Sequence, residues 1–314
     1  MKNQTIGVEI EMTGITKAEA AEVAVNFLGG RITRAYDGYD TYKIIAPDQR
    51  VWKIMNDASI NTMKNTKGKL KAINNKDYSV ELVTPILGYD DIETLQELIR
   101  RLRKAGAVSD SELQCGIHVH IGTKDHTPNT LKNLVNLMAA KEDLIYKSLE
   151  IDPARVRWCK KVNEDLIQAI NKKKPKTLEQ LANIWYSGYG FENRDRHYHT
   201  SRYHGLNLHS TFTKGTIEFR LFQFDPPAEG KQNGLHAGQL KSYIQFCLAL
   251  SQMAKDVKFA SAKRQQNDNP KYAMRTWLLR LGFIGDEFKT ARDVLTKRLE
   301  GDTAFRQKRV SSRS

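Results

Sequence analysis

The sequence predicts an α+β fold built on an antiparallel sheet. Three segments alternate apolar and ionisable residues with period two, as strands with one buried face do: residues 8–12, 117–121 and 217–221. Helical segments are interspersed among these strands without the regular spacing of βαβ units, which favours antiparallel over parallel pairing. The chain has 314 residues, 40% of them hydrophobic, and is therefore long enough to bury a large core.

The N-terminal part is expected to combine short strands with two helices. Strands are predicted at residues 5–12, 42–45, 51–55 and 79–83, with polar loops between them. Helices are predicted at residues 16–28 and 89–104. Thr16 is a suitable N-cap for the first helix, and Gly29-Gly30 would end it. The second helix has acidic residues in its first turn and basic residues in its last, as the helix dipole favours.

The C-terminal part is expected to be mostly helical. Strands are predicted at residues 115–121 and 215–224, and helices at residues 128–150, 154–171 and 234–254. Residues 185–213 are rich in aromatic side chains, histidine and arginine but have no clear period, so no element is assigned there. Residues 256–314 are predicted to form a basic helical extension packed on a catalytic core of residues 1–255.

The chain is strongly basic. It has 50 lysines and arginines against 36 acidic residues, a net charge of +14, and the stretch from Lys258 onward contains 14 basic and 6 acidic residues. This excess has two interpretations: a surface for nucleic acid or another polyanion, or a solvated basic face. No aromatic residues are interleaved in the tail 306–314, as single-strand binding would need. The solvated face is favoured, and nucleic acid stays a possible partner.

The remaining composition indicates a reducing compartment. The three cysteines are widely spaced and form no CxxC motif, which argues against a disulfide framework and against a thiolate zinc site. The N-terminus enters a strand-like run without a basic-then-apolar leader, and no apolar run is long enough to span a bilayer. We therefore expect a cytoplasmic protein without a membrane partner.

Ionisable side chains occupy one face of the three alternating strands. They are Glu9 and Glu11, His118 and His120, and Glu218 and Arg220, with Glu81 added by a fourth segment. A face that only meets solvent would be expected to mix threonine, lysine, serine and glutamine. These residues are instead the types that bind metals, and carboxylates two residues apart repel unless a cation lies between them. The pattern predicts a site for Mg²⁺ or Mn²⁺.

Other kinds of site fit the sequence less well. His-x-His alone is weak evidence for zinc, which prefers more nitrogen and sulfur ligands. Alternation places Cys115 on the apolar face, so a buried structural cysteine is favoured over a Cys–His nucleophile. The sequence contains neither a GxxxxGK[ST] motif nor a GxGxxG motif after a strand. Nucleotide phosphates would therefore have to be held by metal ions and basic side chains.

The chain resembles the amidoligase family common in phages and bacteria, within the glutamine synthetase and glutamate–cysteine ligase superfamily of carboxylate–amine ligases. Seven ordered segments carry the resemblance: GVEIEM (7–12), NDASI (56–60), VELVTPIL (80–87), CGIHVHIG (115–122), SRYHGLNLHS (201–210), GTIEFRLF (215–222) and HAGQLKSYIQFCLAL (236–250). A looser similarity covers residues 278–302. The joint occurrence of these segments in this order is what makes the resemblance specific.

The resemblance implies a glutamine synthetase-like antiparallel sheet whose concave face forms the active site, with helices on the other face. It implies an ATP-dependent ligase that joins a carboxylate to an amine through an acyl phosphate. Glu9, His118 and Glu218 would hold one Mg²⁺ (or Mn²⁺) that bridges the ATP phosphates. Glu11 and Glu81 would hold another. His120 would contact phosphate oxygens, and Arg220 would face the transferred γ-phosphoryl group.

Four further residues match family motifs. Asp57 and Ser59 could border the acceptor pocket, or they could form an Asx-type turn before a strand. Arg202 and Asn207 could contact substrate or phosphate, or they could make structural hydrogen bonds. The family's better-known ligases have glutamate- or cysteine-specific pockets that this sequence does not show. The identities of the carboxylate and the amine therefore stay open, as does the general base for the incoming ammonium.

Two alternative functions stay open. The chain could be a basic polyanion-binding protein that keeps the fold without ligase activity, and the net charge of +14 favours this. It could also be a metal-dependent hydrolase or phosphotransferase that uses the same sheet.

Overall fold

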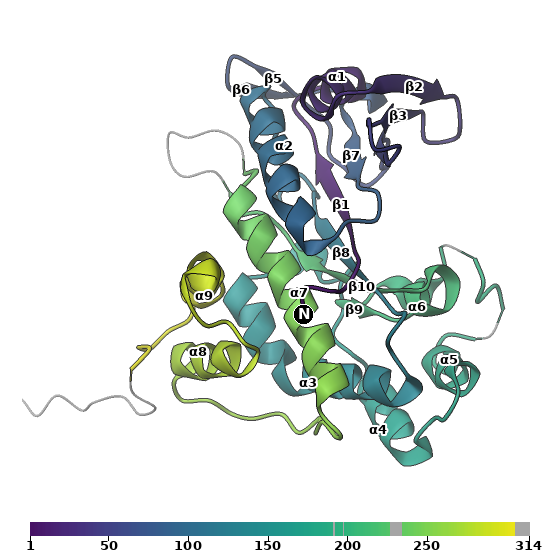
Figure 1. Ribbon diagram of the computed structural model, residues 1–314, viewed down its shortest axis with the longest axis vertical. Helices are drawn as coiled ribbons and strands as arrows, with labels where there is room; N and C mark the ends of the chain where they lie inside the picture. The colour runs from purple at the N-terminus through teal and green to yellow at the C-terminus, as the bar shows by residue number, and fades with distance from the viewer. Residues whose placement is uncertain (191, 197, 227–233, 305–314) are drawn as a thin grey trace, which may run out of the picture.

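The computed structural model describes residues 1–190, 192–196, 198–226 and 234–304. Its centre is an antiparallel sheet in the order β2-β3-β4-β7-β1-β8-β10-β9 (Figure 1). The strands of this sheet are β1 Ile6–Met12, β2 Arg31–Ala35, β3 Thr41–Ile45, β4 Val51–Met55, β7 Val80–Val83, β8 Ile117–Gly122, β9 Leu206–Asn207 and β10 Thr216–Phe222. A separate hairpin is made of β5 Met63–Thr66 and β6 Lys69–Ala72. The predicted α+β class with an antiparallel sheet is confirmed.

Helices cover one face of this sheet and extend beyond its ends (Figure 1). They are α1 Lys17–Leu28, α2 Ile92–Lys104, α3 Pro128–Leu149, α4 Glu164–Lys173, α5 Leu178–Tyr186, α6 His209–Lys214, α7 Ala237–Asp256, α8 Pro270–Arg280 and α9 Lys289–Thr296. Helix α7 lies against β8 and packs on α2, α3 and α9. Among the described helices, none has both the length and the apolar composition needed to cross a bilayer.

The apolar residues of the alternating strands form the core beneath the helices. All of them are at most 1% exposed: Val8, Ile10, Met12, Val80, Leu82, Ile117, Val119, Ile121, Ile217, Phe219 and Leu221. They belong to the same apolar cluster as the inward faces of α2, α3 and α7. Because side chains alternate along a strand, this packing turns the ionisable residues to the opposite face of the sheet.

The first helix is the best-predicted element. Thr16 caps α1 in a capping box, with its side chain accepting the Glu19 backbone N–H and the Glu19 carboxylate accepting the Thr16 backbone N–H. Gly29 follows the helix with φ 76°, a left-handed conformation that glycine adopts without steric cost.

The prediction of a helix at residues 154–171 is wrong for the first half of that range. Only Pro153–Arg155, a single 3₁₀ turn, and α4 are helical there. The backbone of Lys160 pairs instead with the segment before β9, since its N–H donates to Tyr203 O at 3.1 Å and its carbonyl accepts the Gly205 N–H at 2.9 Å. A long-range backbone pairing has replaced the local helix, and sequence periodicity does not reveal such a pairing.

Several elements were not predicted or begin elsewhere. Strands β2, β5, β6 and β9 and helices α5 and α6 were not assigned from the sequence. Helix α7 begins at Ala237 rather than at residue 234. The stretch after α7 is only partly helical, because residues 257–269 contain neither helix nor strand. The basic tail 306–314 lies outside the described residues.

The C-terminal helices pack on α7 rather than standing apart. The Phe246 ring on α7 meets the Trp277 ring of α8 edge-on, with 5.6 Å between centroids. Asp225 pairs with both Lys297 and Arg298 just after α9. The predicted division after residue 255 falls at the last turn of α7 and stays a prediction. Cys115, Cys159 and Cys247 are buried free thiols.

A buried carboxylate on α3 makes stability depend on pH. Glu142 is fully buried, and its two oxygens accept the Val162 N–H at 2.9 and 3.1 Å. Burial raises its pKa to about 7, although the Val162 N–H opposes the shift. A carboxyl group whose pKa is higher in the folded than in the unfolded state contributes stability at pH values below its unfolded-state pKa. This contribution is lost as pH rises through the folded-state pKa.

We therefore expect Glu142→Gln to become more stable relative to the parent chain as pH rises. The free energy of unfolding should shift in favour of the variant by on the order of 2 kcal/mol between about pH 5 and about pH 8. Urea denaturation at both pH values measures this difference. The exposed Glu179→Gln should show no such shift, and a pH-independent difference for Glu142→Gln would contradict the prediction.

Candidate active site on the open face of the sheet

The polar side of the central strands is the floor of a cavity of about 960 Å³. This volume lies within the range of small-molecule and cofactor sites, which is about 300–1,000 Å³. The rim combines aromatic and cationic side chains: Tyr39, Trp158, Tyr198, Tyr203, Lys53 and Lys214. The predicted residues Glu9, Glu11, Asp57, Ser59, Glu81, His118, Arg202 and Arg220 also line it.

Strand register brings the ionisable residues together. Glu9 on β1 is opposite His118 on β8, and Glu11 is opposite Glu81 on β7. Glu218 on β10 is opposite both His120 on β8 and Asn207 on β9. Antiparallel partners on neighbouring strands point to the same face at short range. The pattern read along separate segments is therefore one contiguous patch in space.

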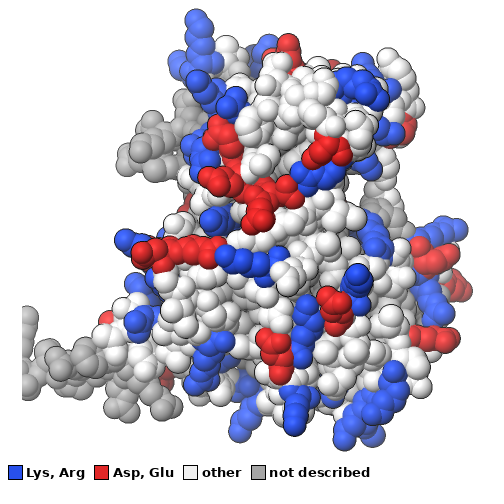
Figure 2. Space-filling model, viewed as in Figure 1, with Lys and Arg blue, Asp and Glu red and all other residues white. Residues whose placement is uncertain are grey.

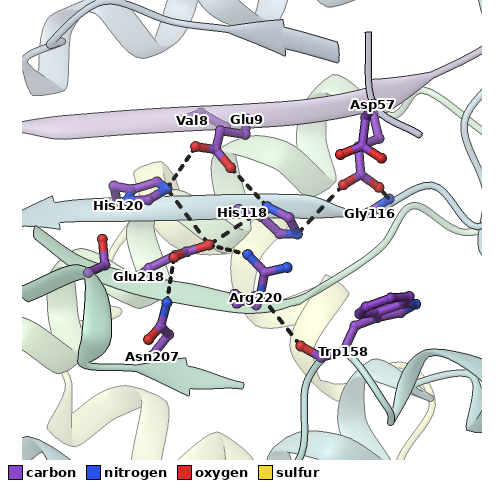
Figure 3. Close-up of polar contacts among 12 residues, drawn as sticks. Val8, Glu9, Asp57, Gly116, His118, His120, Trp158, Asn207, Glu218 and Arg220 are labelled. Atoms are coloured by element: carbon purple, nitrogen blue, oxygen red, sulfur yellow. Dashed lines mark hydrogen bonds and ion pairs between the residues drawn. The ribbon is translucent and has the colours of Figure 1, made fainter. Parts of the chain in front are cut away.

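The first group of contacts is centred on Glu9 and Glu218 (Figure 3). His118 Nδ1 lies 3.0 Å from Glu9 Oε2 and 3.8 Å from Glu218 Oε1. His120 Nε2 lies 3.3 Å from Glu9 Oε1 and 4.0 Å from Glu218 Oε1. Both imidazoles therefore lie between the same two carboxylates.

His120 has one nitrogen that is fixed and one that is not. Its Nδ1 pairs with the Thr216 hydroxyl at 3.0 Å. Its Nε2 is buried and makes no hydrogen bond within the described residues, although two carboxylates lie nearby. A buried polar atom without a hydrogen bond is costly. A cation shared with Glu9 and Glu218 would satisfy it.

Arg220 is held at the edge of this group. Its Nη1 donates to Glu218 Oε1 at 2.5 Å, and its Nε donates to Trp158 O at 3.4 Å. Asn207 Nδ2 donates to the other Glu218 oxygen at 2.7 Å. Arg220 and Glu218 are 6% and 2% exposed, so this is a desolvated ion pair with little freedom to reorient.

A second acidic group lies beside the first. Glu11, Asp57 and Glu81 each offer an oxygen within 4.8 Å of the others. Glu11 Oε2 also accepts the Gly116 N–H at 2.6 Å. Its Oε1 lies 3.8 Å from His118 Nε2, so His118 stands between the two groups.

The two groups differ in their electrostatics. Burial raises the pKa of Glu81 well above its ordinary value, and the charges of Glu9, Glu11 and Asp57 raise it further. Burial also raises the pKa of Glu11, against the attraction of His118. Full ionisation of this second group is therefore unfavourable without an added positive charge.

In the first group, attraction outweighs burial. Burial raises the pKa of Glu9, but His120 and His118 lower it well below its ordinary value. Burial likewise opposes ionisation of Glu218, and Arg220 with His120 lowers its pKa despite this. The carboxylates of this group are ionised. Oxygen and imidazole ligands of this kind suit Mg²⁺ or Mn²⁺, so the donor atoms of both groups fit a hard divalent cation.

A family comparison agrees with this geometry. Residues 2–251 match the family described as "Putative amidoligase enzyme". The chain belongs to this amidoligase family. The match contains every site residue above, and it ends inside α7.

Comparisons with individual proteins add little to the family match. The search of curated proteins found no match to this chain. Among solved structures, the chain is similar to glutamate–cysteine ligase from Francisella tularensis in complex with AMP. The TM-score is 0.36 at 10% sequence identity, covering 95% of this chain and 72% of that one. A likeness at this level transfers neither a substrate nor a residue role.

The structure shows the positions of the four further residues that were predicted from family motifs. Asp57 Oδ1 accepts both the backbone N–H and the hydroxyl of Ser59, at 2.7 and 2.5 Å, which is the Asx-type turn that was one expectation. The same carboxylate also belongs to the second acidic group. Asn207 is buried, and Arg202 lies over the Tyr198 and Tyr203 rings, 5.3 and 5.9 Å from their centroids.

The sequence interpretation missed several cavity residues, and three of them lie close to the charged groups. Arg155 is 3% exposed, lines the cavity, and donates to Phe222 O at 2.5 Å. Lys214 Nζ lies 3.9 Å from Glu9 Oε1. Trp158 contributes its ring to the rim and its carbonyl to Arg220. None of them lies on an alternating strand, and no local pattern indicated them.

Proposed function

We propose that the chain is an ATP-dependent carboxylate–amine ligase that forms an amide or isopeptide bond through an acyl phosphate. The convergence of carboxylates and imidazoles from four strands with the buried guanidinium of Arg220 carries this proposal. Some of these residues line the cavity (Glu9, Glu11, Glu81, His118 and Arg220), and His120 and Glu218 contact them from β8 and β10. Membership of the amidoligase family supports it. The cavity of about 960 Å³ has room for a nucleotide and part of an acceptor.

Each of the two groups would bind one divalent cation. Glu9 and Glu218, with His120 or His118, would hold one divalent cation, and Glu11, Glu81 and Asp57 would hold another. The sequence-based assignment gave His118 to the first cation and His120 to phosphate. The geometry supports His120 as a ligand of the first cation at least as well as His118, because the buried Nε2 of His120 makes no hydrogen bond with a described residue. Bound cations would neutralise phosphate charge.

The proposed chemistry has two steps. A carboxylate oxygen attacks the γ-phosphorus of ATP, so an O–P bond forms while the bond to ADP breaks. The amine nitrogen then attacks the acyl carbon, a C–N bond forms, phosphate leaves, and a base accepts the amine proton. Phosphoryl transfer depends chiefly on positioning and charge neutralisation. Arg220 would supply a fixed positive charge for the transferred group, oriented by Glu218 and Trp158 O.

The acceptor end of the cavity is proposed to lie near Asp57 and Ser59. Both residues line the cavity next to the second acidic group. Arg202, on the rim, would contact the nucleotide or the acceptor, whereas Asn207 would act by holding Glu218. The partners are then a carboxylate donor and an amine acceptor, each a small molecule, a peptide or a protein side chain.

Release of ADP and phosphate from ATP tests this function. With Mg²⁺ and a panel of amino acids, polyamines and peptides, we expect release that depends on an acceptor pair and that stops when EDTA removes the metal. Mn²⁺ should restore it, and its electron paramagnetic resonance signal should report binding. ATP-independent hydrolysis of an amide or ester would favour the hydrolase alternative instead. ATP turnover unaffected by Glu9→Gln in a clean preparation would refute the ligase.

A further inference from the structure

The β5–β6 hairpin projects from the main sheet close to α1 (Figure 1). Lys67 and Gly68 connect its strands with φ values of 47° and 89°. Two consecutive positive φ values are typical of the type I′ turn, which matches the twist of a tight hairpin. A two-stranded hairpin by itself is only marginally stable in water, and this one is anchored to the rest of the fold through β5.

This hairpin concentrates positive charge on one face. Lys64 is directly opposite Lys71, and Lys69 is opposite Thr66. Since cross-strand partners and alternate residues share a face, three lysines lie together there, with Lys67 at the turn. All four are exposed, and none forms an ion pair with a described residue. Figure 2 shows blue side chains protruding at the end of the molecule where Figure 1 places the hairpin.

Like charges opposite each other destabilise a strand pair. No acidic residue occurs between residues 58 and 76 to offset them. A negatively charged partner along this face would remove the repulsion. The fold thus keeps an unfavourable arrangement at a place where an anion would make it favourable.

One edge of the hairpin is available for a further strand. The outer edge of β5 is paired with Gly14, whose N–H donates to Met63 O at 3.0 Å and whose carbonyl accepts the Asn65 N–H at 2.9 Å. The outer edge of β6, residues 69–72, has no backbone partner among the described residues, and all four are exposed. An extended peptide could add to such an edge through main-chain hydrogen bonds.

The hairpin is also continuous with the cavity. Residues 56–59, which line the cavity, lead into β5. Lys76, which follows β6, lines the cavity as well. The end of the hairpin opposite its turn therefore leads in both directions along the chain to residues of the cavity wall, Asp57 among them.

We propose that the β5–β6 hairpin docks an acidic polypeptide as an added strand on β6, with its carboxylates on the lysine face. A peptide fits better than nucleic acid for two reasons. No aromatic residue lies on the hairpin for base stacking, and the free edge supplies a peptide-specific mode of pairing. The docked chain would be the macromolecular substrate of the cavity, and this second statement rests on the proposed ligase function.

Fluorescence anisotropy of labelled decaglutamate with the full chain, at low salt and without ATP, tests the docking. Glutamine at Lys64, Lys67, Lys69 and Lys71 together is expected to weaken binding roughly tenfold, because exposed ion pairs contribute modestly and add up. Arginine at the same four positions should retain it. The matched control places glutamine at four exposed lysines near the end of α4: Lys172, Lys173, Lys174 and Lys176. The control should bind like the parent chain.

Three results would overturn the proposal. The first is equal affinity of the hairpin variant and the control variant. The second is that an oligothymidylate of equal charge binds more tightly than decaglutamate and loses this affinity in the hairpin variant. The third concerns pairing: glutamates separated by prolines carry the same charge but cannot add as a strand, and their binding equally well would refute strand addition.

Catalysis gives a separate readout. If both proposals hold, acidic peptides ending in a reactive carboxylate or amine stimulate ADP release with a lower KM than short acceptors, and the hairpin variant loses only that difference. If the ligase function fails, no ADP is released while peptide binding persists. Binding that fails while short acceptors still turn over would remove the docking proposal alone.

Discussion

Glutamine in place of Glu218 is expected to lower the rate of ADP release about a thousandfold. Glu218 accepts hydrogen bonds from Arg220 and Asn207 and lies within 4.0 Å of both imidazoles (Figure 3). The substitution keeps the size of the side chain but removes its charge. It therefore removes a cation ligand and releases the guanidinium that the proposed reaction requires in a fixed position.

The measurement is kcat for ADP release at saturating ATP and Mg²⁺, with the best acceptor from the panel. Glu22→Gln replaces an exposed glutamate on α1 that does not line the cavity, and its kcat should equal that of the parent. Glu218→Gln also leaves Arg220 buried without its counter-charge, and we expect this to cost on the order of 3 kcal/mol of stability. Thermal unfolding must therefore show that the variant is folded. A folded variant with parental kcat would remove Glu218 from the mechanism.

Alanine in place of Phe246 is expected to lower the free energy of unfolding by about 3–5 kcal/mol. The ring is fully buried at the junction of α7 with α8, where it packs edge-on against Trp277. Truncation removes the transfer free energy of the ring and leaves a cavity between two helices that are themselves anchored. The surroundings can close around it only in part.

Urea denaturation followed by circular dichroism gives this free energy. Phe259→Ala is the matched control, since that ring is 67% exposed just after α7, and we expect a change within about 0.5 kcal/mol. If the C-terminal helices unfold before the rest, the transition will have two phases. A small effect of Phe246→Ala would mean that α8 contributes little to the stability of the core, and would favour the predicted division after residue 255.

The buried and polar faces of the alternating strands were predictable from local sequence alone. Period-two sequence assigned the buried and the polar faces of β1, β8 and β10 correctly, because burial of one face is a local constraint on each strand. The capping box at Thr16 was likewise predictable, since its hydrogen bonds join residues three apart. Ligand types on the polar faces predicted a cation site before any neighbour was known.

Pairings between distant segments were not predictable in the same way. The turn around Lys160 replaced a predicted helix because its backbone bonds to residues more than 40 positions away. Asp57 joins Glu11 and Glu81 through the positions of three separate segments, and Arg155 reaches the cavity from a 3₁₀ turn. Such contacts depend on how elements pack, and a single sequence has no period that records them.

The sequence by itself determined the chemistry available to this protein: carboxylates, imidazoles and one arginine on the polar faces of strands, and the family whose segments contain them. Tertiary structure decided which of these groups meet. Strand order and register set Glu218 against His120 and Glu11 against Glu81, and register depends on the packing of the whole sheet. The lysine face of the β5–β6 hairpin belongs to the same category, because Lys64 and Lys71 become neighbours only when the turn between them forms.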